Sequence, residues 1–288
     1  MKKQSIAFLM MFGCLGVTRL ASAAENIMTL SGITPTSGSS ASIVSGGILQ
    51  LTNNSLADPT YQIGSAYSTK TVNFSNFNAA FSFQFSGANT KYSSTYSADG
   101  IVFVIKNADS KASGGAGGGL GYGTIATGNG KSYTGIPNSI GIEFDNWQNY
   151  EVSDPNNNHI GINVNGSVNS LATANISPAF NGNGPWYAWV DYDGSNLSVS
   201  VSTTNSKPGT AMLSYEIGDL ETYIGSPTGV IGFTGSTGLA TQTQQVLSLN
   251  YVNNQIGAVP EPGMLALFGT GGLMAFGRKH MTKRRYIS

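Results

Sequence analysis

Apolar residues recur at every second position in several short stretches of this chain, and this period constrains the fold more than any other feature. Residues 81–85 read FSFQF, and residues 197–201 and 247–251 follow the same alternation. Successive side chains of a strand point to opposite faces, so the pattern predicts strands with one buried face. The body shows no convincing 3.6-residue apolar period, which an amphipathic helix would need.

Further apolar segments, separated by Gly, Asn and Asp clusters, indicate more strands, some of them buried on both faces. They read GIVFVIKN, SIGIEFD, HIGINVNG, WYAWVDYDG and GVIGFTG. No internal repeat or domain linker occurs before about residue 255 of the 288. A β-sandwich of about 200–250 residues can form one domain. We therefore expect an all-β fold of two packed antiparallel sheets, with long loops at one rim.

The first 23 residues have the three parts of a secretory signal peptide. Lys2 and Lys3 give a basic start, an apolar run follows, and Ala21-Ser22-Ala23 forms a small-residue cleavage site. Cys14, the only cysteine, lies in this apolar run, where the preceding residues fit a lipoprotein anchor poorly. The body therefore has no disulfide and no thiolate metal site, and we expect export with cleavage after Ala23.

The C-terminal segment, 257–288, has a second three-part pattern: Pro260-Glu261-Pro262, an apolar stretch Gly263–Gly277, and a basic tail. The fifteen apolar residues are short for a spanning helix, which needs about 20, so they predict a transient anchor. The pattern resembles the PEP-CTERM sorting signal of exopolysaccharide-producing Gram-negative bacteria. The resemblance implies processing by an exosortase-type membrane protease, then display on the cell surface or secretion. Residues 24–256 remain as the functional domain.

The charge of the body argues against nucleic acid as a partner. All 14 acidic residues lie between Glu25 and Glu261, together with six lysines and no arginine, so this span has a net charge of −8. Nucleic-acid binding depends on clustered Lys and Arg.

Acidic residues and one of the two histidines gather in a single segment, 142–162, which reads IEFDNWQNYEVSDPNNNHIGI. Strands over 139–145 and 159–164 would pair, with 146–158 as their loop. Glu143 and Asp145 then share one face, and the loop brings Asp154 and His159 back to them. A divalent cation would relieve the repulsion between the carboxylates. Oxygen ligands suit Ca²⁺, and a carboxylate–imidazole set suits Mn²⁺ or another transition metal.

Simpler interpretations of this segment are a solvated acidic loop and a structural histidine. An EF-hand is disfavoured, because His159 stands where that loop needs glycine and Asn165 stands where it needs glutamate.

The spacing Glu143-x-Asp145-x-Trp147-x-Asn149, followed by Asp154 and His159, resembles the two-metal motif of legume-type (L-type) lectins. Other segments between about 25 and 255 are also similar to that family, which implies its jelly-roll sandwich. The resemblance implies a transition-metal site formed by Glu143, Asp145, Asp154 and His159. It implies a Ca²⁺ site formed by Asp145, the Trp147 carbonyl, Asn149 and Asp154.

The same resemblance implies a carbohydrate site formed by Asp99, Gly118 and Asn149, with Trp147 stacking on the sugar. A carboxylate accepts charge-assisted bonds from sugar hydroxyls, and an asparagine offers its carbonyl to Ca²⁺ and its amide to the sugar. The family pattern also implies a cis bond between Ala98 and Asp99. We expect Ca²⁺ to order the binding loop without touching the sugar, and the loop Thr237–Gln242 to set sugar preference.

Two enzyme classes are disfavoured. Jelly-roll glycosidases carry E-x-D-x-x-E, whereas this chain has Gln148 at the last position, and an amide cannot protonate a leaving group. A Ser-His-Asp hydrolase needs a free histidine, but His159 is assigned to metal and His280 lies in the tail. We expect a metal-dependent carbohydrate-binding protein of extracellular or cell-surface polysaccharide, and not an enzyme. A matrix component without sugar specificity remains the alternative, and the oligomeric state stays open.

Overall fold

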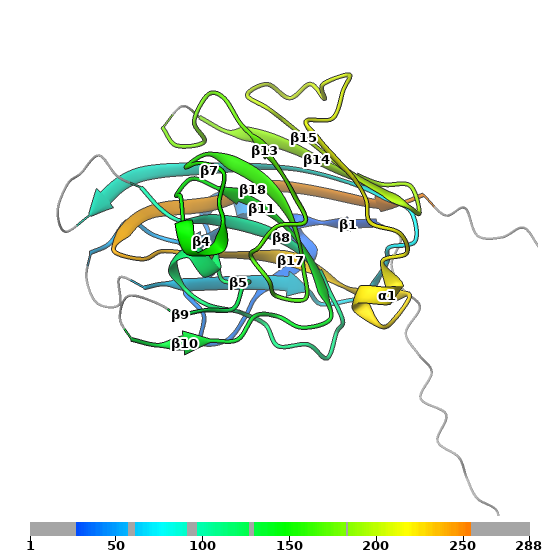
Figure 1. Ribbon diagram of the computed structural model, residues 1–288, viewed down its shortest axis with the longest axis horizontal. Helices are drawn as coiled ribbons and strands as arrows, with labels where there is room; N and C mark the ends of the chain where they lie inside the picture. The colour runs from blue at the N-terminus through cyan, green and yellow to red at the C-terminus, as the bar shows by residue number, and fades with distance from the viewer. Residues whose placement is uncertain (1–26, 57–60, 91–96, 127–129, 183, 255–288) are drawn as a thin grey trace, which may run out of the picture.

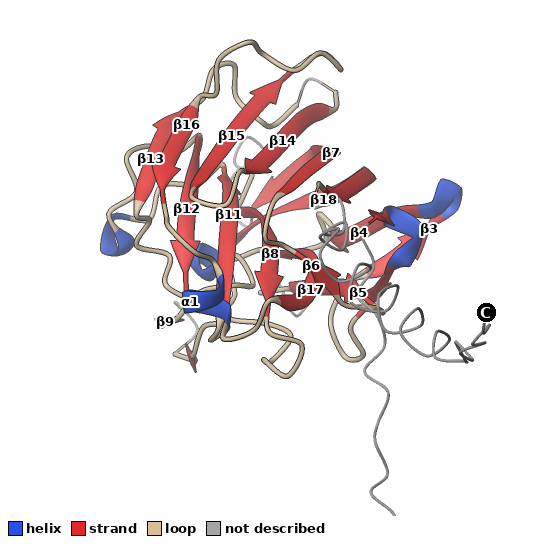
Figure 2. Cartoon of the chain, turned by 90° about the vertical axis from the view of Figure 1, so that its right-hand side faces the viewer, coloured by secondary structure: helices blue, strands red, loops and turns tan. Residues whose placement is uncertain are grey.

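Two antiparallel sheets packed face to face make up most of the computed structural model, which describes residues 27–56, 61–90, 97–126, 130–182 and 184–254 (Figure 1). Each sheet has eight strands in the described ranges, and a two-stranded ribbon lies apart from them. The layers are visible in Figure 2, where β12, β11, β8 and β17 lie side by side. The expected all-β sandwich is therefore confirmed.

We name the two sheets after their central strands. The β7 sheet contains, in spatial order, β16 (Leu213–Glu216), β15 (Asn196–Ser202), β14 (Trp186–Tyr192), β7 (Phe77–Thr90), β18 (Ala240–Asn253), β4 (Ile48–Thr52) and β3 (Ser42–Val44), with β1 (Ile27–Thr29) also paired to β18. The β11 sheet contains β13 (Ala172–Asn175), β12 (His159–Val164), β11 (Ser139–Asp145), β8 (Gly100–Lys106), β17 (Thr228–Ser236), β5 (Ile63–Ser68) and β2 (Ile33–Pro35), with β6 (Val72–Asn73) also paired to β17.

The remaining elements are short. The ribbon pairs β9 (Ile125–Ala126) with β10 (Ser132–Tyr133). One α-helical turn, α1 (Glu221–Ile224), and four 3₁₀ turns, η1 (Leu30–Gly32), η2 (Ser45–Gly47), η3 (Gly117–Gly119) and η4 (Tyr150–Val152), complete the described part. No helix of the described ranges has the length and apolarity needed to cross a membrane. The expected signal peptide and the apolar segment Gly263–Gly277 lie outside the described residues.

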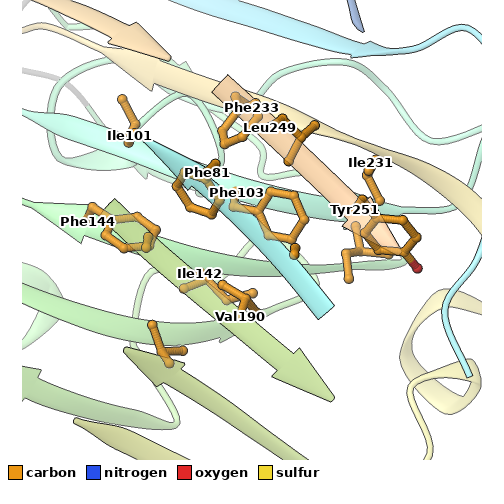
Figure 3. Packing of buried hydrophobic residues seen from close by; sticks show 14 of the residues in the cluster. Phe81, Ile101, Phe103, Ile142, Phe144, Val190, Ile231, Phe233, Leu249 and Tyr251 are labelled. Atoms are coloured by element: carbon orange, nitrogen blue, oxygen red, sulfur yellow. The ribbon is translucent and has the colours of Figure 1, made fainter. Parts of the chain in front are cut away.

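The core between the sheets is built from aromatic residues at the predicted alternating positions. Phe81 of β7 packs against Phe103, Phe144 and Phe233 of the opposite sheet, with ring centroids 5.5, 5.4 and 5.1 Å away (Figure 3). Offset and edge-on aromatic contacts at this distance add to the burial of their apolar surface. This packing holds β8, β11 and β17 of the β11 sheet against β7.

Alternation along β11 decides where the acidic residues point. Ile140, Ile142 and Phe144 enter the main core, so Glu143 and Asp145 point to the outer face of the β11 sheet. Loops cover this outer face and form a second apolar cluster that includes Leu120, Tyr122, Ile136 and Val152. As a result Glu143 and Asp145 are only 1% and 2% exposed, although they face away from the main core.

Candidate functional site

The acidic segment forms a hairpin at one end of the β11 sheet. Strands β11 and β12 pair in antiparallel register, so that Asp145 lies opposite His159 and Glu143 lies opposite Gly161. The observed strands coincide with the predicted ones, 139–145 and 159–164. An ordinary strand ladder therefore places a carboxylate directly beside an imidazole.

The predicted metal ligands converge at this end of the hairpin. Ligand atoms of Asp145, Asp154 and His159 all lie within 4.8 Å of one another. His159 Nε2 is 3.4 Å from Glu143 Oε1 and 3.8 Å from Asp154 Oδ1. The carboxylates of Asp145 and Asp154 and the His159 imidazole thus surround one point, and the Glu143 carboxylate lies beside the imidazole.

The imidazole of His159 is oriented to present a lone pair to this point. Its Nδ1 lies 3.0 Å from the Asn156 carbonyl oxygen, which can only accept, so Nδ1 carries the proton and Nε2 is the basic nitrogen. Nε2 is buried and has no hydrogen-bond partner among the described residues. A backbone acceptor on the far ring nitrogen is the usual arrangement of a metal-binding histidine.

Backbone bonds shape the loop around the carboxylates. The Trp147 N–H donates to Asp145 Oδ1, and the Asn149 N–H donates to Asp154 Oδ2, both at 2.6 Å. Each carboxylate uses one oxygen in these bonds. The loop backbone therefore folds around Asp145 and Asp154 instead of extending into solvent, contrary to a freely solvated acidic loop.

Two residues that the sequence reasoning missed hold Glu143 in place. Asn163 Nδ2 donates to Glu143 Oε2 at 2.5 Å, and Ser170 Oγ donates to Glu143 Oε1 at 2.6 Å. Asn163 lies four residues after His159 on β12, and this even spacing on one strand could have placed both on one face. Gly161 between them leaves room, because a Cβ there would lie 2.2 Å from Glu143 Oε1.

The acidic groups carry perturbed pKa values because they are buried together. Burial, followed by repulsion from Asp154 and Glu143, raises the pKa of Asp145 well above its usual range. Burial raises the pKa of Asp154 to about 6. Burial disfavours protonation of His159, but the adjacent Glu143 and Asp154 carboxylates raise its pKa overall. In the absence of a cation, bound protons reduce the repulsion at this cluster.

Asp99 lies near this acidic cluster, directly before β8. The peptide bond Ala98–Asp99 is cis, as the family pattern implied. The Asp99 backbone bridges two elements, since its N–H donates to the Ser236 carbonyl at 3.0 Å and its carbonyl accepts from the Asn146 N–H at 2.9 Å. The side chain is 4% exposed, and its Oδ2 has no hydrogen-bond partner in the described part of the chain. Burial and the charges of Asp154 and Glu151 raise its pKa well above normal.

Gly118 and Asn149 lie in direct contact. A Cβ on Gly118 would lie 2.4 Å from Asn149 Oδ1 and from its Cγ, so only glycine fits at 118 without moving this amide. Asn149 Oδ1 is buried without a hydrogen-bond partner in the described ranges. Gly118 belongs to η3 and is buried, so this glycine-rich stretch is a packed part of the fold.

Trp147 is half-buried and belongs to neither hydrophobic cluster of the described residues. It is therefore not a core residue.

Gln148, which stands where a glycosidase would need an acid, donates an amide hydrogen to the Asp154 carbonyl at 3.2 Å. Its contact is with the loop backbone.

The extent predicted for the loop Thr237–Gln242 is wrong. Strand β17 ends at Ser236 and β18 begins at Ala240, so 237–239 form a tight connection. Thr237 and Gln242 are fully buried, whereas Leu239 is 48% exposed. Strand β18 already pairs with β7 at Ala240, within the segment that was expected to be a loop. Gly238 lies beside Asp99, since a Cβ built on it would lie 3.4 Å from Asp99 Oδ2.

Comparison with known proteins decides the family. The sequence model of the legume lectin domain matches residues 29–264. The chain belongs to the legume lectin family. Legume lectins bind carbohydrate without transforming it, and they generally bind metal ions, in agreement with the expected non-enzymatic role.

Individual lectins support this assignment. The chain is 32% identical over 213 residues to the L-type lectin-domain containing receptor kinase VIII.1 of Arabidopsis thaliana, covering 70% of this chain and 28% of that protein. It thus spans less than a third of that receptor kinase. It is 33% identical to a galactose-binding lectin of Arachis hypogaea over 57% of each chain, and 30% identical to a lectin of Leucomphalos mildbraedii over 75% of this chain and 89% of that one.

Solved legume lectins share the fold. Peanut lectin in complex with a nonapeptide superimposes with a TM-score of 0.60 at 24% identity, covering 78% of this chain and 95% of that one. A Bauhinia forficata lectin in complex with GalNAc gives a TM-score of 0.57 at 25% identity, with coverages of 80% and 93%. The PEP-CTERM protein-sorting motif matches residues 258–285, which confirms the second resemblance and marks the chain as an exported Gram-negative bacterial protein.

Proposed function

We propose that this lectin binds extracellular or cell-surface polysaccharide through a site that requires Ca²⁺ and a transition metal such as Mn²⁺. The observation that carries the proposal is the convergence of Asp145, Asp154 and His159, whose ligand atoms lie within 4.8 Å of one another. Near them, Asn149 Oδ1 and Asp99 Oδ2 are buried without a hydrogen-bond partner in the described ranges. A buried polar atom without a partner is costly, so such a set supports a site completed by ligands.

The donor chemistry fits two different ions. Glu143, Asp145, Asp154 and His159 form a mixed oxygen and nitrogen set, which suits Mn²⁺ or another transition metal. Asp145, the Trp147 carbonyl, Asn149 and Asp154 offer only oxygen, which suits Ca²⁺. Both ions would supply positive charge that neutralises the buried carboxylates and keeps the loop 146–158 folded against the strands.

The carbohydrate contacts would come from residues next to this metal core. Asp99 would accept hydrogen bonds from two sugar hydroxyls, the amide of Asn149 would donate one, and the indole of Trp147 would cover the apolar face of the ring. Gly118 would keep the Asn149 amide in position by leaving it space. Galactose-type sugars belong in the first panel, because one relative is a galactose-binding lectin.

Localisation and processing follow from the two terminal signals. We infer that residues 1–23 direct export, and that an exosortase-type protease removes the segment 257–288 after transient membrane anchoring. The mature domain, 24–256, would then remain on the cell surface or enter the medium.

Glycan-array binding tests the proposed function. The purified chain should bind with Ca²⁺ and Mn²⁺ present, lose binding in EDTA, and recover it when Ca²⁺ and Mn²⁺ are returned. Binding unaffected by complete metal removal would refute the metal requirement. If no glycan bound although elemental analysis detected both metals, a matrix component without sugar specificity would be favoured.

A further inference from the structure

A second group of aromatic side chains lies on the far side of the sandwich from the metal cluster, on the outer face of the β7 sheet. Along β14, the residues Trp186, Ala188, Val190 and Tyr192 are buried in the main core. The intervening Tyr187, Trp189 and Asp191 are partly exposed and therefore point outward. Nothing in the proposed metal-dependent site uses them.

The strand register surrounds these rings with short side chains. Trp189 lies between Ala80 of β7 and Ser200 of β15, and Tyr187 lies between Ser82 and Ser202. Cross-strand neighbours on one face are about 4.5–5.5 Å apart. The two rings therefore stand above their neighbours instead of being covered by them.

Two hollows adjoin this aromatic pair. A groove of about 220 Å³ is lined by Tyr187, Trp189, Ser248, Asn250 and Asn205, among others. A second groove of about 350 Å³ is lined by residues that include Asn78, Asp191, Asn196 and Lys207. The two follow one another along β14, because Trp189 and Asp191 are successive outward residues about 7 Å apart. We call the two together the β14 trough.

The chemistry of the first groove suits a neutral sugar ring. It is lined by an indole, a phenol, a serine hydroxyl and two asparagine amides, with no charged residue. An aromatic face receives the apolar side of a ring, while hydroxyl and amide groups can both donate to and accept from sugar hydroxyls. In the second groove the charge of Asp191 is paired with Lys207 Nζ at 2.5 Å, and the carboxylate of Asp193 leaves one net negative charge there. This charge disfavours an anionic polymer and is compatible with a neutral one.

A protein partner fits this face less well. Serines contribute to the outward surface, including Ser198, Ser202 and Ser248, and serine is depleted in protein interfaces relative to the rest of the surface. The apolar centre that a large stable interface needs is limited here to the two rings.

We propose that the β14 trough is a second carbohydrate site, independent of metal, that binds a neutral polysaccharide chain with Trp189 and Tyr187 as its stacking platform. This site does not rest on the proposed metal-dependent function. With two sites on opposite faces of the sandwich, one molecule could contact two polymer chains, and two linked sites raise the overall avidity for a polymer.

Affinity electrophoresis in EDTA tests this site, because the metal-dependent site is inactive there. The purified chain would be run through gels containing hydroxyethylcellulose, laminarin, mannan or galactomannan. We expect at least one polymer to retard the protein in EDTA, and Trp189→Ala to weaken that binding by about tenfold or more, as for an aromatic hot spot. Trp189→Phe should retain most of it, because it keeps a flat ring.

The matched control is Tyr133→Ala, which removes a partly exposed aromatic from the β9–β10 ribbon, outside the trough. It should leave retardation unchanged, and an unchanged melting temperature would show that each variant is folded. No retardation by any of the four polymers in EDTA, or equal retardation of wild type and Trp189→Ala, overturns the proposal. A dimer in solution that Trp189→Ala converts to a monomer would also overturn it, since the face would then belong to a second copy of the chain.

Discussion

Asp145 and His159 are register partners across the ladder between β11 and β12. Opposed residues of an antiparallel pair have neighbouring Cβ atoms, so the β11 sheet itself holds these two ligands together. Asp154 and Asn149, in contrast, come from the connecting loop. There the Asn149 N–H donates to Asp154 Oδ2 at 2.6 Å, and the Asp154 N–H donates to the Asn149 carbonyl at 3.3 Å. Half of the proposed metal site is therefore positioned by the sheet, and the other half depends on the loop.

The first prediction concerns the pH dependence of the metal-free protein. The pKa values of Asp99 and Asp145 are raised by burial, that of Asp154 is raised to about 6, and that of His159 is raised as well. Between about pH 4, the ordinary pKa of Asp, and a pH above 6.5, the ordinary pKa of His, the folded state therefore binds more protons than the unfolded state. Raising the pH through this window should lower the free energy of unfolding.

With Ca²⁺ and Mn²⁺ present, the free energy of unfolding should instead rise with pH over this range. The reason is that deprotonated carboxylates and neutral histidine are the forms that bind metal. Urea unfolding between pH 4.5 and 8, in EDTA and in both metals, measures the two slopes. Asp154→Asn is the control, because it removes one of the titrating groups and should flatten the metal-free slope. A metal-free wild type that gained stability relative to this variant as the pH rose would contradict the prediction.

The second prediction is that Gly118→Ala weakens carbohydrate binding while leaving the fold intact. The new Cβ would lie 2.4 Å from Asn149 Oδ1, so the amide must move from its place beside the metal core. We expect affinity to fall by tenfold or more, which corresponds to about 1.4 kcal/mol or more. Titration with the sugar that the glycan array identifies measures this.

Gly209→Ala provides the matched control, because a Cβ at Gly209 would meet nothing within 4 Å. It should bind as the wild type does. Equal affinity of Gly118→Ala and Gly209→Ala would show that the Asn149 amide takes no part in binding.

The third prediction concerns the core. Phe81 is 2% exposed and its ring contacts three phenylalanines of the opposite sheet. Phe81→Ala should lower the free energy of unfolding by about 3–5 kcal/mol. Ile43→Ala, at a side chain 47% exposed, should change it by less than about 0.5 kcal/mol. Denaturant unfolding of both variants checks the difference, and equal values would place Phe81 outside the stabilising core.

Local periodicity was sufficient to predict the strands that carry the site. The strands over 139–145 and 159–164 end where the structure ends them, because the alternation and the polar loop are both encoded within a few residues. That pairing alone places Asp145 beside His159, and the connecting loop brings Asp154 to them. The role of Asn163 could also have been deduced from its even spacing after His159.

Long-range features could not be predicted in this way. Strand β18 pairs with β7 over most of its length, with register shifts at Thr241–Thr243 and Val246–Ser248 that no local pattern marks. The glycine-rich stretch around Gly118 lacks any strand period, yet Leu120 and Tyr122 bury it over the β11 sheet. Such packing depends on residues far away in the sequence. The start of β18 at Ala240 also depends on a distant strand, β7, and it shortens the connection after Thr237.

The fourth prediction assigns Gln242 a supporting role instead of a direct one in sugar preference. Gln242 and Asn146 exchange two amide hydrogen bonds, at 2.9 and 3.0 Å, and both are buried. Gln242→Leu would leave the Asn146 amide short of a partner and should destabilise the protein by about 1–3 kcal/mol. Leu239→Ala, at an exposed position of the same connection, should leave stability nearly unchanged.

Glycan arrays of these two variants separate stability from selectivity. Leu239→Ala should change the order of sugar preference, whereas Gln242→Leu should weaken binding to all sugars without changing their order. If only Gln242→Leu changed the order of sugar preference, the buried Gln242 would determine which sugar is bound, and Leu239 would not.

The fifth prediction separates the two roles assigned to Asn149. Its Oδ1 lies buried without a partner in the described chain, while its Nδ2 donates to Glu151 Oε1 at 3.3 Å. Asn149→Asp keeps an oxygen for Ca²⁺ but has no amide hydrogen to donate. It should retain Ca²⁺, measured by calorimetry, and lose carbohydrate affinity by about tenfold or more, the effect of losing a buried polar contact of about 1.4 kcal/mol.

Asn149→Ala should lose both activities, because it removes the oxygen ligand as well as the donor. Asn169→Asp, at an exposed residue, adds the same charge elsewhere and should change neither. If Asn149→Asp bound sugar as the wild type does, the amide would not contact the ligand, and Asn149 would act only as a ligand of Ca²⁺. If instead it lost Ca²⁺, the added charge beside Glu151 and Asp99 would outweigh the gain of a charged ligand, and the two roles would be inseparable at this position.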